Sequence, residues 1–162
     1  SACTRDPAML DVARDSEAGL VLMHMAGNPQ TMQQAPQYTH VVDEVAEYLK
    51  SRMAACRCHG IDERRIVLDP GFGFGKTQEH NFALFRQCTV AVPGEFPLLV
   101  GVSRKSMLGQ ITGRPVEDRV TASVVAALLA AQKGAKILRV HDVAQTKDAL
   151  AAWAALKSGD EL

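Results

Sequence analysis

Short, largely apolar runs alternate along this chain with longer amphipathic segments, and each kind of pattern predicts its own element. Four apolar runs of strand length predict β-strands, at residues 20–25, 65–69, 97–102 and 136–140. Segments with apolar residues every three or four positions predict helices, at residues 6–19, 42–60, 77–90, 120–134 and around 150–154. The polar stretch 30–38 is predicted to be a loop.

The order of these elements is one helix followed by four strand–helix units. Strands that are apolar throughout and alternate with helices are typical of a parallel sheet covered by helices. Four such units make half of an eight-stranded (β/α)8 TIM barrel, which usually takes about 250 residues, whereas this chain has 162. We therefore expect an α/β fold of parallel (βα) units, about half of a (β/α)8 TIM barrel, as a single domain over residues 1–162.

The composition narrows the class of protein. Hydrophobic residues make up 47% and charged residues 22% of the chain, as in a soluble globular domain. Lysine plus arginine (18) balance aspartate plus glutamate (18), so no net field favours nucleic acid or an acidic membrane as a partner. No apolar run is long enough to predict a transmembrane helix or a signal peptide. Because Ser1 stands where an initiator methionine is usual, residues 1–5 look like a loop within a larger protein.

Four cysteines, at positions 3, 56, 58 and 88, raise the question of a metal site. Cys56 and Cys58 have a single residue between them and are followed by His59, whereas a zinc site needs Cys-x2-Cys-type spacing and a second pair of ligands. We therefore interpret the cysteines as reduced thiols, which favours a cytoplasmic protein.

A glycine-rich turn after the second predicted strand is the most informative local motif. Residues 66–77, IVLDPGFGFGKT, place Asp69 at the end of the strand and three glycines directly after it. The P-loop motif needs glycine at the position of Pro70, and the dinucleotide-binding motif needs one at the position of Lys76, so neither nucleotide signature is present. The turn is either an ordinary strand-to-helix connection or one that brings the backbone close to a bound molecule.

Polar groups stand at the carboxyl end of every predicted strand. They are His24 near the end of the first strand, Asp69 at the end of the second, Ser103-Arg104-Lys105 after the third, and Arg139 and His141 at the fourth. In a parallel sheet these ends meet at one rim, where α/β enzymes bind their ligands. Lys105, Arg139 and His141 can surround one anion, and Asp69 can accept hydrogen bonds from a heterocycle. The pattern predicts a ligand with an anionic group at one end and a hydrogen-bond-donating ring at the other.

These residue types also allow structural roles. Asp69 could form an ion pair with Lys105 or Arg139, and His24 could be a hydrogen-bonded core residue. Arg104 could be a solvated charge at the rim, and Met23, Met25 and Phe74 could serve in packing. The methionines and Phe74 equally suit the flat apolar walls that a planar ring needs.

Four motifs in this order resemble dihydropteroate synthase, a family with a pterin-binding (β/α)8 barrel. They are residues 22–32 (LMHMAGNPQTM), 68–76 (LDPGFGFGK), 100–107 (VGVSRKSM) and 138–143 (LRVHDV). The resemblance covers essentially the whole chain and implies strands 5–8 of the barrel, its C-terminal half. It also implies the family's transferase reaction in folate biosynthesis. That reaction joins 7,8-dihydropterin-6-ylmethyl diphosphate to 4-aminobenzoate, giving 7,8-dihydropteroate and pyrophosphate.

The resemblance assigns roles to individual residues. The pterin contacts would be Asp69, Lys105, Met23, Phe74 and Gly101. The diphosphate contacts would be Arg139, Val140 and His141. The aminobenzoate contacts, where sulfonamides also bind in this family, would be Phe74, Ser103 and Arg104. The family's dissociative mechanism needs stabilisation of the departing pyrophosphate and no strong base, so the catalytic residues would be Lys105, Arg139 and His141.

The resemblance further implies Mg2+ as a cofactor, with its ligand in the barrel's first half and none in this chain. It implies a homodimer formed through helices of this half, with an apolar face such as Val124, Ala127 and Leu128 at the contact. We expect no turnover from these 162 residues alone. Two other interpretations are a non-catalytic pterin- and anion-binding half-barrel or assembly module, and a pterin-dependent methyltransferase relative. The second is disfavoured by residues 103–106 and the Arg139/His141 pair, because a methyl donor without diphosphate needs no such clamp.

Overall fold

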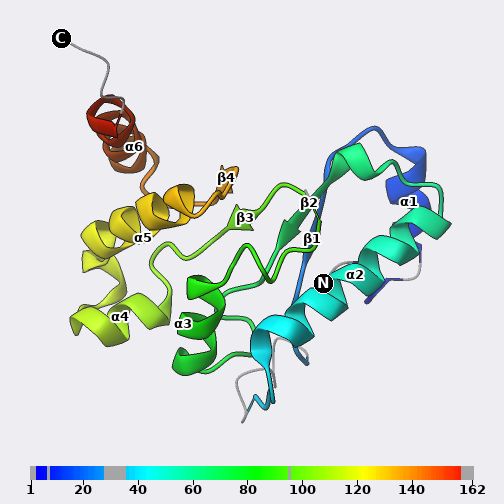
Figure 1. Ribbon diagram of the computed structural model, residues 1–162, viewed down its shortest axis with the longest axis horizontal. Coiled ribbons are helices and arrows are strands. Elements are labelled where there is room, and N and C mark those ends of the chain that lie inside the picture. Colours follow the sequence, from blue (N-terminus) through cyan, green and yellow to red (C-terminus); the bar gives the residue numbers. More distant parts are fainter. Residues whose placement is uncertain (1–2, 7, 28–35, 95, 158–162) are drawn as a thin grey trace.

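The computed structural model describes residues 3–6, 8–27, 36–94 and 96–157. Most of the loop predicted at 30–38 lies outside these described residues. Four short strands cross the centre of the molecule, with α-helices beside and beyond them (Figure 1). The strands are β1 (Leu20–Met23), β2 (Ile66–Asp69), β3 (Leu99–Val100) and β4 (Ile137–Leu138).

The described strand pairings are all parallel. β1 pairs with β2 so that Leu22 lies opposite Leu68 and Met23 opposite Asp69. β3 pairs with β4, and a parallel bridge between Leu68 and Leu98 joins the two pairs. The strands therefore follow in the order β1-β2-β3-β4, with their carboxyl ends at one rim. This confirms the expected α/β architecture and matches consecutive strands of a (β/α)8 barrel.

The helices are α1 (Met9–Asp15), α2 (Val41–Cys58), α3 (Gln78–Arg86), α4 (Ser106–Thr112), α5 (Val120–Gln132) and α6 (Val143–Lys157), with 3-10 helices η1 (Glu63–Arg65) and η2 (Val116–Asp118). Periodicity did not predict α4, because its seven residues give too short a pattern. α4 begins directly after Lys105 and ends at Gly113, whose φ of 67° is left-handed. The third strand is thus followed by two helices, α4 and α5.

The helical stripe predicted at 42–56 is the face by which α2 covers the sheet. Val45, Leu49 and Cys56 are fully buried, and they join Leu22 and Leu68 of the strands in the main core. Burying one aliphatic side chain of this size contributes about 2 kcal/mol. This packing fixes the strands whose ends carry the polar groups.

α3 begins with a reciprocal cap that also fixes the end of the glycine-rich turn. The Oγ1 atom of Thr77 accepts a 3.2 Å hydrogen bond from the amide of His80, and Nδ1 of His80 accepts a 3.3 Å bond from the amide of Thr77. Two otherwise unpaired amides of the helix start are satisfied in this way.

The apolar face predicted at Val124, Ala127 and Leu128 needs a correction. Ala127 is only 1% exposed, so it is buried within the chain and is not free for a partner. The exposed apolar residues of α5 are Val125 (51%) and Leu129 (44%). The stripe that periodicity identified is therefore mainly the inward face of the helix, and the outward face is also apolar.

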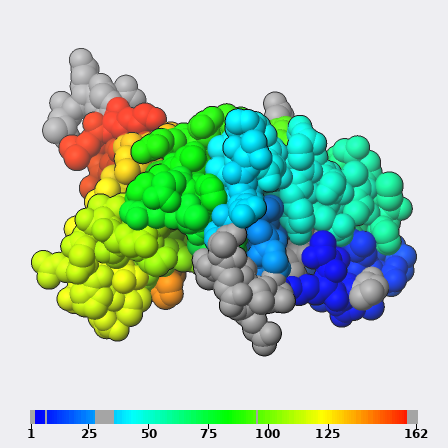
Figure 2. Space-filling model, turned by 90° about the horizontal axis from the view of Figure 1, so that it is seen from below, coloured from blue at the N-terminus to red at the C-terminus, as the bar shows by residue number. Residues whose placement is uncertain are grey.

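Two lobes lie at opposite ends of the molecule. Figure 2 shows α4 and α5 at one end, α1 and α2 at the other, and α3 between them. α6 packs against α5 but buries only Thr146 of its own residues. The outer strands expose Val21 (45%) and Ile137 (40%), as expected for a sheet whose edges are open. No helix among the described residues has both the length and the apolar character needed to cross a membrane.

Candidate functional site

Asp69, the last residue of β2, lies at the rim and is 3% exposed. Its Oδ1 atom accepts a 2.7 Å hydrogen bond from the amide of Gly71, and its Oδ2 atom is 3.9 Å from the guanidinium of Arg139. Burial raises the pKa of this carboxyl, while the Gly71 amide and the charges of Arg139, Lys105 and Lys76 lower it. An ion pair at 3.9 Å is loose, so Oδ2 keeps the capacity to accept hydrogen bonds from a ligand.

A pocket of about 240 Å³ opens at the ends of β3 and β4. Its lining residues are Gly101, Ser103, Lys105, Arg139, Val140 and His141. All six were predicted from sequence as site residues. A Cβ atom at Gly101 would lie 2.8 Å from a guanidinium nitrogen of Arg139, so a side chain there would require the flexible Arg139 side chain to shift. In this structure the space next to Gly101 therefore holds Arg139, which in turn approaches Asp69.

Lys105 connects this pocket to the glycine-rich turn. Its ammonium lies 4.1 Å from the centre of the Phe74 ring, which is a cation–π distance. Gly73 of the turn runs alongside, since a Cβ atom there would lie 3.3 Å from Cδ of Lys105. Burial and the charge of Arg139 lower the pKa of Lys105, whereas Asp69 raises it. The pocket thus has a flat aromatic wall next to a cation.

Ser103 holds His141 on the other side of the pocket. The buried Oγ atom of Ser103 accepts a 3.2 Å hydrogen bond from the amide of His141 and lies 3.0 Å from its Nδ1 atom. His141 is exposed, and the side chain of Arg139 is 58% exposed. Both nitrogen-bearing groups therefore face solvent, where a charged anion can approach them.

Arg104 is not a solvated rim charge, and that alternative is wrong. Its guanidinium donates hydrogen bonds of 3.0 and 2.6 Å to Asp142, and both side chains are largely buried. The φ of 57° at Arg104 is left-handed; its amide donates to Oγ of Ser123 at 2.8 Å, and its carbonyl accepts from Arg119 at 3.0 Å. These contacts fix the segment that presents Lys105.

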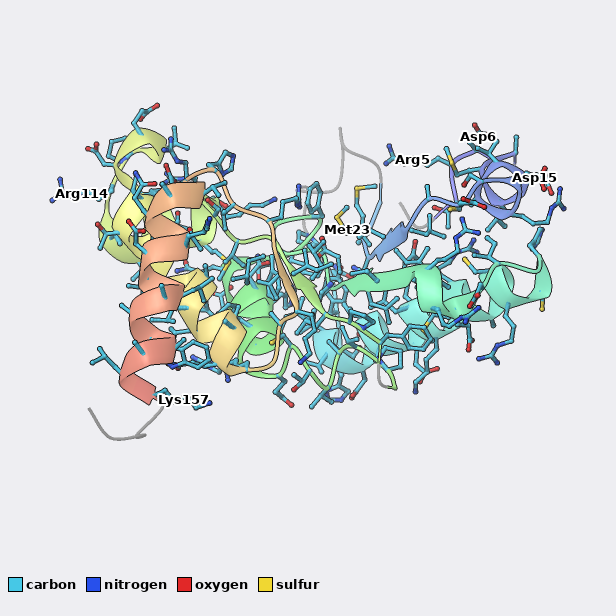
Figure 3. All side chains as sticks on the ribbon, turned by 90° about the horizontal axis from the view of Figure 1, so that it is seen from above. Arg5, Asp6, Asp15, Met23, Arg114 and Lys157 are labelled. Atoms are coloured by element: carbon cyan, nitrogen blue, oxygen red, sulfur yellow. The ribbon has the colours of Figure 1, made fainter. Side chains whose placement is uncertain are left out.

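The end of β1 contributes Met23 and His24. Figure 3 shows Met23 midway between the two ends of the molecule, and its Cγ atom packs close to Gly71. His24 is 6% exposed, its Nδ1 atom is 2.9 Å from Nζ of Lys76, and its ring meets Tyr48 edge to face. Burial, and then the charge of Lys76, lowers the pKa of His24 to about 3. His24 is therefore a hydrogen-bonded core histidine, in line with its structural interpretation.

Lys76 is a buried residue that the sequence did not single out. It is 4% exposed and lies against His24. The available signal was its place at the end of the glycine-rich turn. A lysine there suggests a phosphate-binding loop, and the proline at position 70 excludes that motif.

Burial of a neutral His24 predicts a pH dependence of stability. Between its folded pKa of about 3 and its ordinary value of 6.5, the unfolded chain binds a proton that the folded chain does not. The contribution of neutral His24 to the free energy of unfolding is therefore fully present above pH 6.5. It decreases as the pH is lowered below that value, by up to about 1.4 kcal/mol per pH unit. His24→Gln keeps an acceptor for Lys76 without titrating, and it is expected to lose this slope in urea unfolding between about pH 4 and 6. Equal slopes in both proteins would contradict the burial of His24.

Metal ligands do not cluster in the part of the chain that the structure describes. No group of three or more histidine, cysteine, aspartate or glutamate side chains there could hold a metal ion. Asp69 and Asp142, the carboxylates at this rim, are hydrogen-bonded to an amide and to a guanidinium. The described residues therefore do not fit a Mg2+ site.

Comparison with known proteins finds one family. A family model described as pterin binding enzyme matches residues 1–141. A dihydropteroate synthase of Neisseria meningitidis serogroup C is 54% identical over 148 residues, which cover 90% of this chain and 52% of that protein. The chain spans about half the length of the curated relatives it matches.

Solved structures give the same match in three dimensions. A dihydropteroate synthase of Burkholderia cenocepacia, complexed with 7,8-dihydropteroate, has a TM-score of 0.89 and 47% identity, covering 95% of this chain and 58% of that chain. A dihydropteroate synthase of Stenotrophomonas maltophilia has a TM-score of 0.92 and 44% identity, covering 97% of this chain and 60% of that chain. These similarities confirm the resemblance inferred from the four motifs and the partial-barrel architecture.

Proposed function

The chain belongs to the pterin binding enzyme family, and from this premise we propose that it acts in dihydropteroate synthesis. The substrates would be 7,8-dihydropterin-6-ylmethyl diphosphate and 4-aminobenzoate, and the products 7,8-dihydropteroate and pyrophosphate. One observation carries the proposal: cationic groups from the ends of β3 and β4 line one pocket, and the carboxylate that ends β2 lies 3.9 Å from one of them. The relatives are dihydropteroate synthases, and one solved relative holds 7,8-dihydropteroate, which supports the same reaction.

The pterin ring would lie between Asp69 and Lys105. A pterin presents a ring N–H and an amino group on one edge, and two donors of this kind suit the oxygens of a carboxylate. Lys105 would donate to acceptors of the ring. Phe74 and Met23 would form the apolar walls of the ring site, and Gly101 would keep the backbone close to it.

The diphosphate would lie against Arg139, Val140 and His141. A guanidinium can bind two phosphate oxygens at once, and His141 can donate a further hydrogen bond. As the bond from the methylene carbon to the diphosphate breaks, negative charge grows on the leaving group, and the cations of the pocket stabilise it. The electron-rich ring stabilises the cationic methylene, which the amine of 4-aminobenzoate then attacks to form the C–N bond, and the nitrogen releases one proton to solvent.

4-Aminobenzoate would approach along Phe74 and the Ser103-Arg104 segment. The Phe74 ring offers a face for stacking. Ser103 lines the pocket with its hydroxyl next to His141. The guanidinium of Arg104 donates its hydrogen bonds to Asp142. To bind the carboxylate of the substrate, it would have to release Asp142 or donate to both carboxylates at once.

Calorimetric titration tests these contacts. The chain is expected to bind 7,8-dihydropterin-6-ylmethyl diphosphate. Arg139→Ala or Lys105→Ala should each weaken binding by about 1–3 kcal/mol, roughly 5- to 150-fold. Lys133→Ala is the control for net charge, because Lys133 is exposed and donates to a carbonyl outside the pocket, that of Arg86. Unchanged affinity in both pocket variants would refute the assigned contacts.

A non-catalytic pterin- and anion-binding module is the second candidate function. The observation that favours it is the pocket at the ends of β3 and β4, whose nitrogen-bearing side chains can hold an anion without turnover. A turnover assay separates the two. The chain is incubated with both substrates, alone and together with the unmatched half of the Neisseria relative. Product in either mixture supports the synthase, and binding without product in both supports the module.

We propose that a second copy of the chain packs on a groove between α3, α4 and α5. The groove has a volume of about 440 Å³, and its lining includes Phe82, Phe85, Ile111, Val125 and Leu129. Ile111, Val125 and Leu129 are 61%, 51% and 44% exposed, which is a costly exposure of apolar surface for a monomer. The resemblance to a dimeric family supports the same partner.

Leu129→Asp is expected to shift the chain from dimer to monomer in light scattering, because it places a charge at the centre of an apolar contact. Leu156→Asp is the matched control, since Leu156 is 87% exposed on α6, away from the groove. A dimer that persists in Leu129→Asp, or a wild-type monomer, would contradict the proposed interface.

We propose a reducing compartment, the cytoplasm, as the location. All four cysteines are free, which is typical of proteins in such compartments. Burial raises the pKa of the Cys56 and Cys88 thiols, so these two stay protonated and unreactive.

A further inference from the structure

One buried amine contacts both ends of the glycine-rich turn. Lys76 is 4% exposed, and its Nζ atom lies 2.9 Å from the carbonyl oxygen of Gly71 and 3.2 Å from that of Phe74. The third contact, at 2.9 Å, is Nδ1 of His24 at the end of β1. A lysine ammonium has three N–H donors and no acceptor. In the ammonium form of Lys76, these three donors match the three neighbouring acceptors, with Nδ1 of His24 as one of them.

The turn needs such support because its backbone is unusual. Gly71, Gly73 and Gly75 have φ angles of 73°, 75° and 66°, all in the left-handed region. The amide of Phe74 donates to the Gly71 carbonyl at 3.2 Å, and the amide of Gly73 donates to the side chain of Asn81 at 2.7 Å. The turn is thus held by a backbone hydrogen bond together with the side chains of Asn81 and Lys76.

The turn carries two of the proposed ligand groups. Asp69 precedes it, and the Gly71 amide donates to Oδ1 of this carboxylate at 2.7 Å. Phe74 lies in it, with its ring 4.1 Å from the ammonium of Lys105. A shift of the turn would therefore move the aromatic wall and the partner of the carboxylate together.

The environment of Lys76 disfavours its charged form. Burial lowers the pKa of Lys76 to about 7, against an opposing contribution from Asp69. A buried amine is costly unless its hydrogen bonds are made. Here they are made to the turn and to His24, so the amine and the conformation of the turn stabilise each other.

We propose that Lys76 is a positioning residue for the pterin and aminobenzoate subsites: its buried amine fixes the conformation of residues 71–75 and thereby sets the positions of Phe74 and Asp69. Lys76 acts through the turn, not by contact with the ligand. The identity of the ligand rests on the proposed function, whereas the effect on the turn does not.

Amide hydrogen exchange measures that effect without any ligand. Lys76→Met keeps the stem but removes the donors, and the amides of Gly73 and Phe74 should then exchange about tenfold faster or more, while core amides of α2 keep their rates. The matched control is Lys133→Met, which loses an exposed lysine that also donates to a backbone carbonyl. Unchanged exchange in the turn, or equal acceleration throughout the chain, would overturn the proposal.

A double-mutant cycle with 7,8-dihydropteroate tests the positioning itself. Lys76→Met is expected to raise the Kd about tenfold or more, and to have an effect of less than about threefold when Phe74→Leu is already present. Full additivity would overturn the proposal. If the wild-type chain does not bind 7,8-dihydropteroate, the proposed function fails, while the exchange experiment still decides the role of Lys76. If Lys76→Met does not fold, Lys76→Gln, which keeps N–H donors without a charge, takes its place in both experiments.

Discussion

Replacing Gly71 with alanine is expected to destabilise the chain by about 3 kcal/mol or more, because two separate costs add. Gly71 has a φ of 73°, and this left-handed conformation costs an L-residue about 1–2 kcal/mol. A Cβ atom at this position would also collide with the backbone carbonyl of His24, which cannot swing away as a flexible side chain can. Urea unfolding of the two proteins measures the loss.

Gly60→Ala is the matched control for that experiment. Gly60 has a φ of 76°, close to that of Gly71, but a Cβ atom there would meet no atom within 4 Å. Gly60→Ala should therefore lower the free energy of unfolding only by the backbone strain, about 1–2 kcal/mol. The difference between the variants isolates the contact of the turn with the end of β1. Equal losses in both would contradict that contact.

Asp69→Asn is expected to lower the affinity for 7,8-dihydropterin-6-ylmethyl diphosphate by about 100-fold, equivalent to about 3 kcal/mol. Asparagine keeps the shape and an acceptor for the Gly71 amide, but it loses the negative charge and one of the two acceptor oxygens. Because burial raises the pKa of Asp69, wild-type affinity should also fall as the pH drops through that raised value. Calorimetry over a pH series measures both effects.

Asp62→Asn provides the comparison at the other end of the same strand. Asp62 caps η1 just before β2 and accepts a hydrogen bond from the amide of Arg64. The substitution is expected to lower the free energy of unfolding slightly, because Asp62 caps a helix. Affinity for the pterin diphosphate should stay within about twofold of wild type, because Asp62 lies away from the rim. If Asp69→Asn binds as well as Asp62→Asn, Asp69 is not the pterin carboxylate.

The convergence of the site could be predicted from the hydrophobic pattern alone. Once four apolar strands alternate with helices, the parallel topology brings their carboxyl ends to one rim, whatever their distance in sequence. Oδ2 of Asp69, which ends β2, accordingly lies 3.9 Å from the guanidinium of Arg139, which follows β4. The hydrophobic pattern does not report which residues form ladder hydrogen bonds, so the strands predicted at 97–102 and 136–140 are longer than β3 and β4.

Two features of the site could not be predicted, because each depends on a partner distant in sequence. Arg104 binds Asp142, 38 positions away, and Lys76 contacts His24, 52 positions away. The sequence does not distinguish a cationic side chain that faces solvent from one that is buried beneath the backbone. The left-handed φ directs the side chain of Arg104, and the glycine-rich turn directs that of Lys76. Both conformations exist only in the folded chain.

Amide chemical-shift mapping tests most directly whether the three strand ends form one ligand site. On titration with 7,8-dihydropterin-6-ylmethyl diphosphate, the amides of Gly71, Gly101, Lys105 and His141 are expected to shift together with a common midpoint, while those of α1 and α6 stay in place. Shifts confined to a single strand end, separate midpoints, or no shift at these residues would contradict a shared pterin and diphosphate pocket.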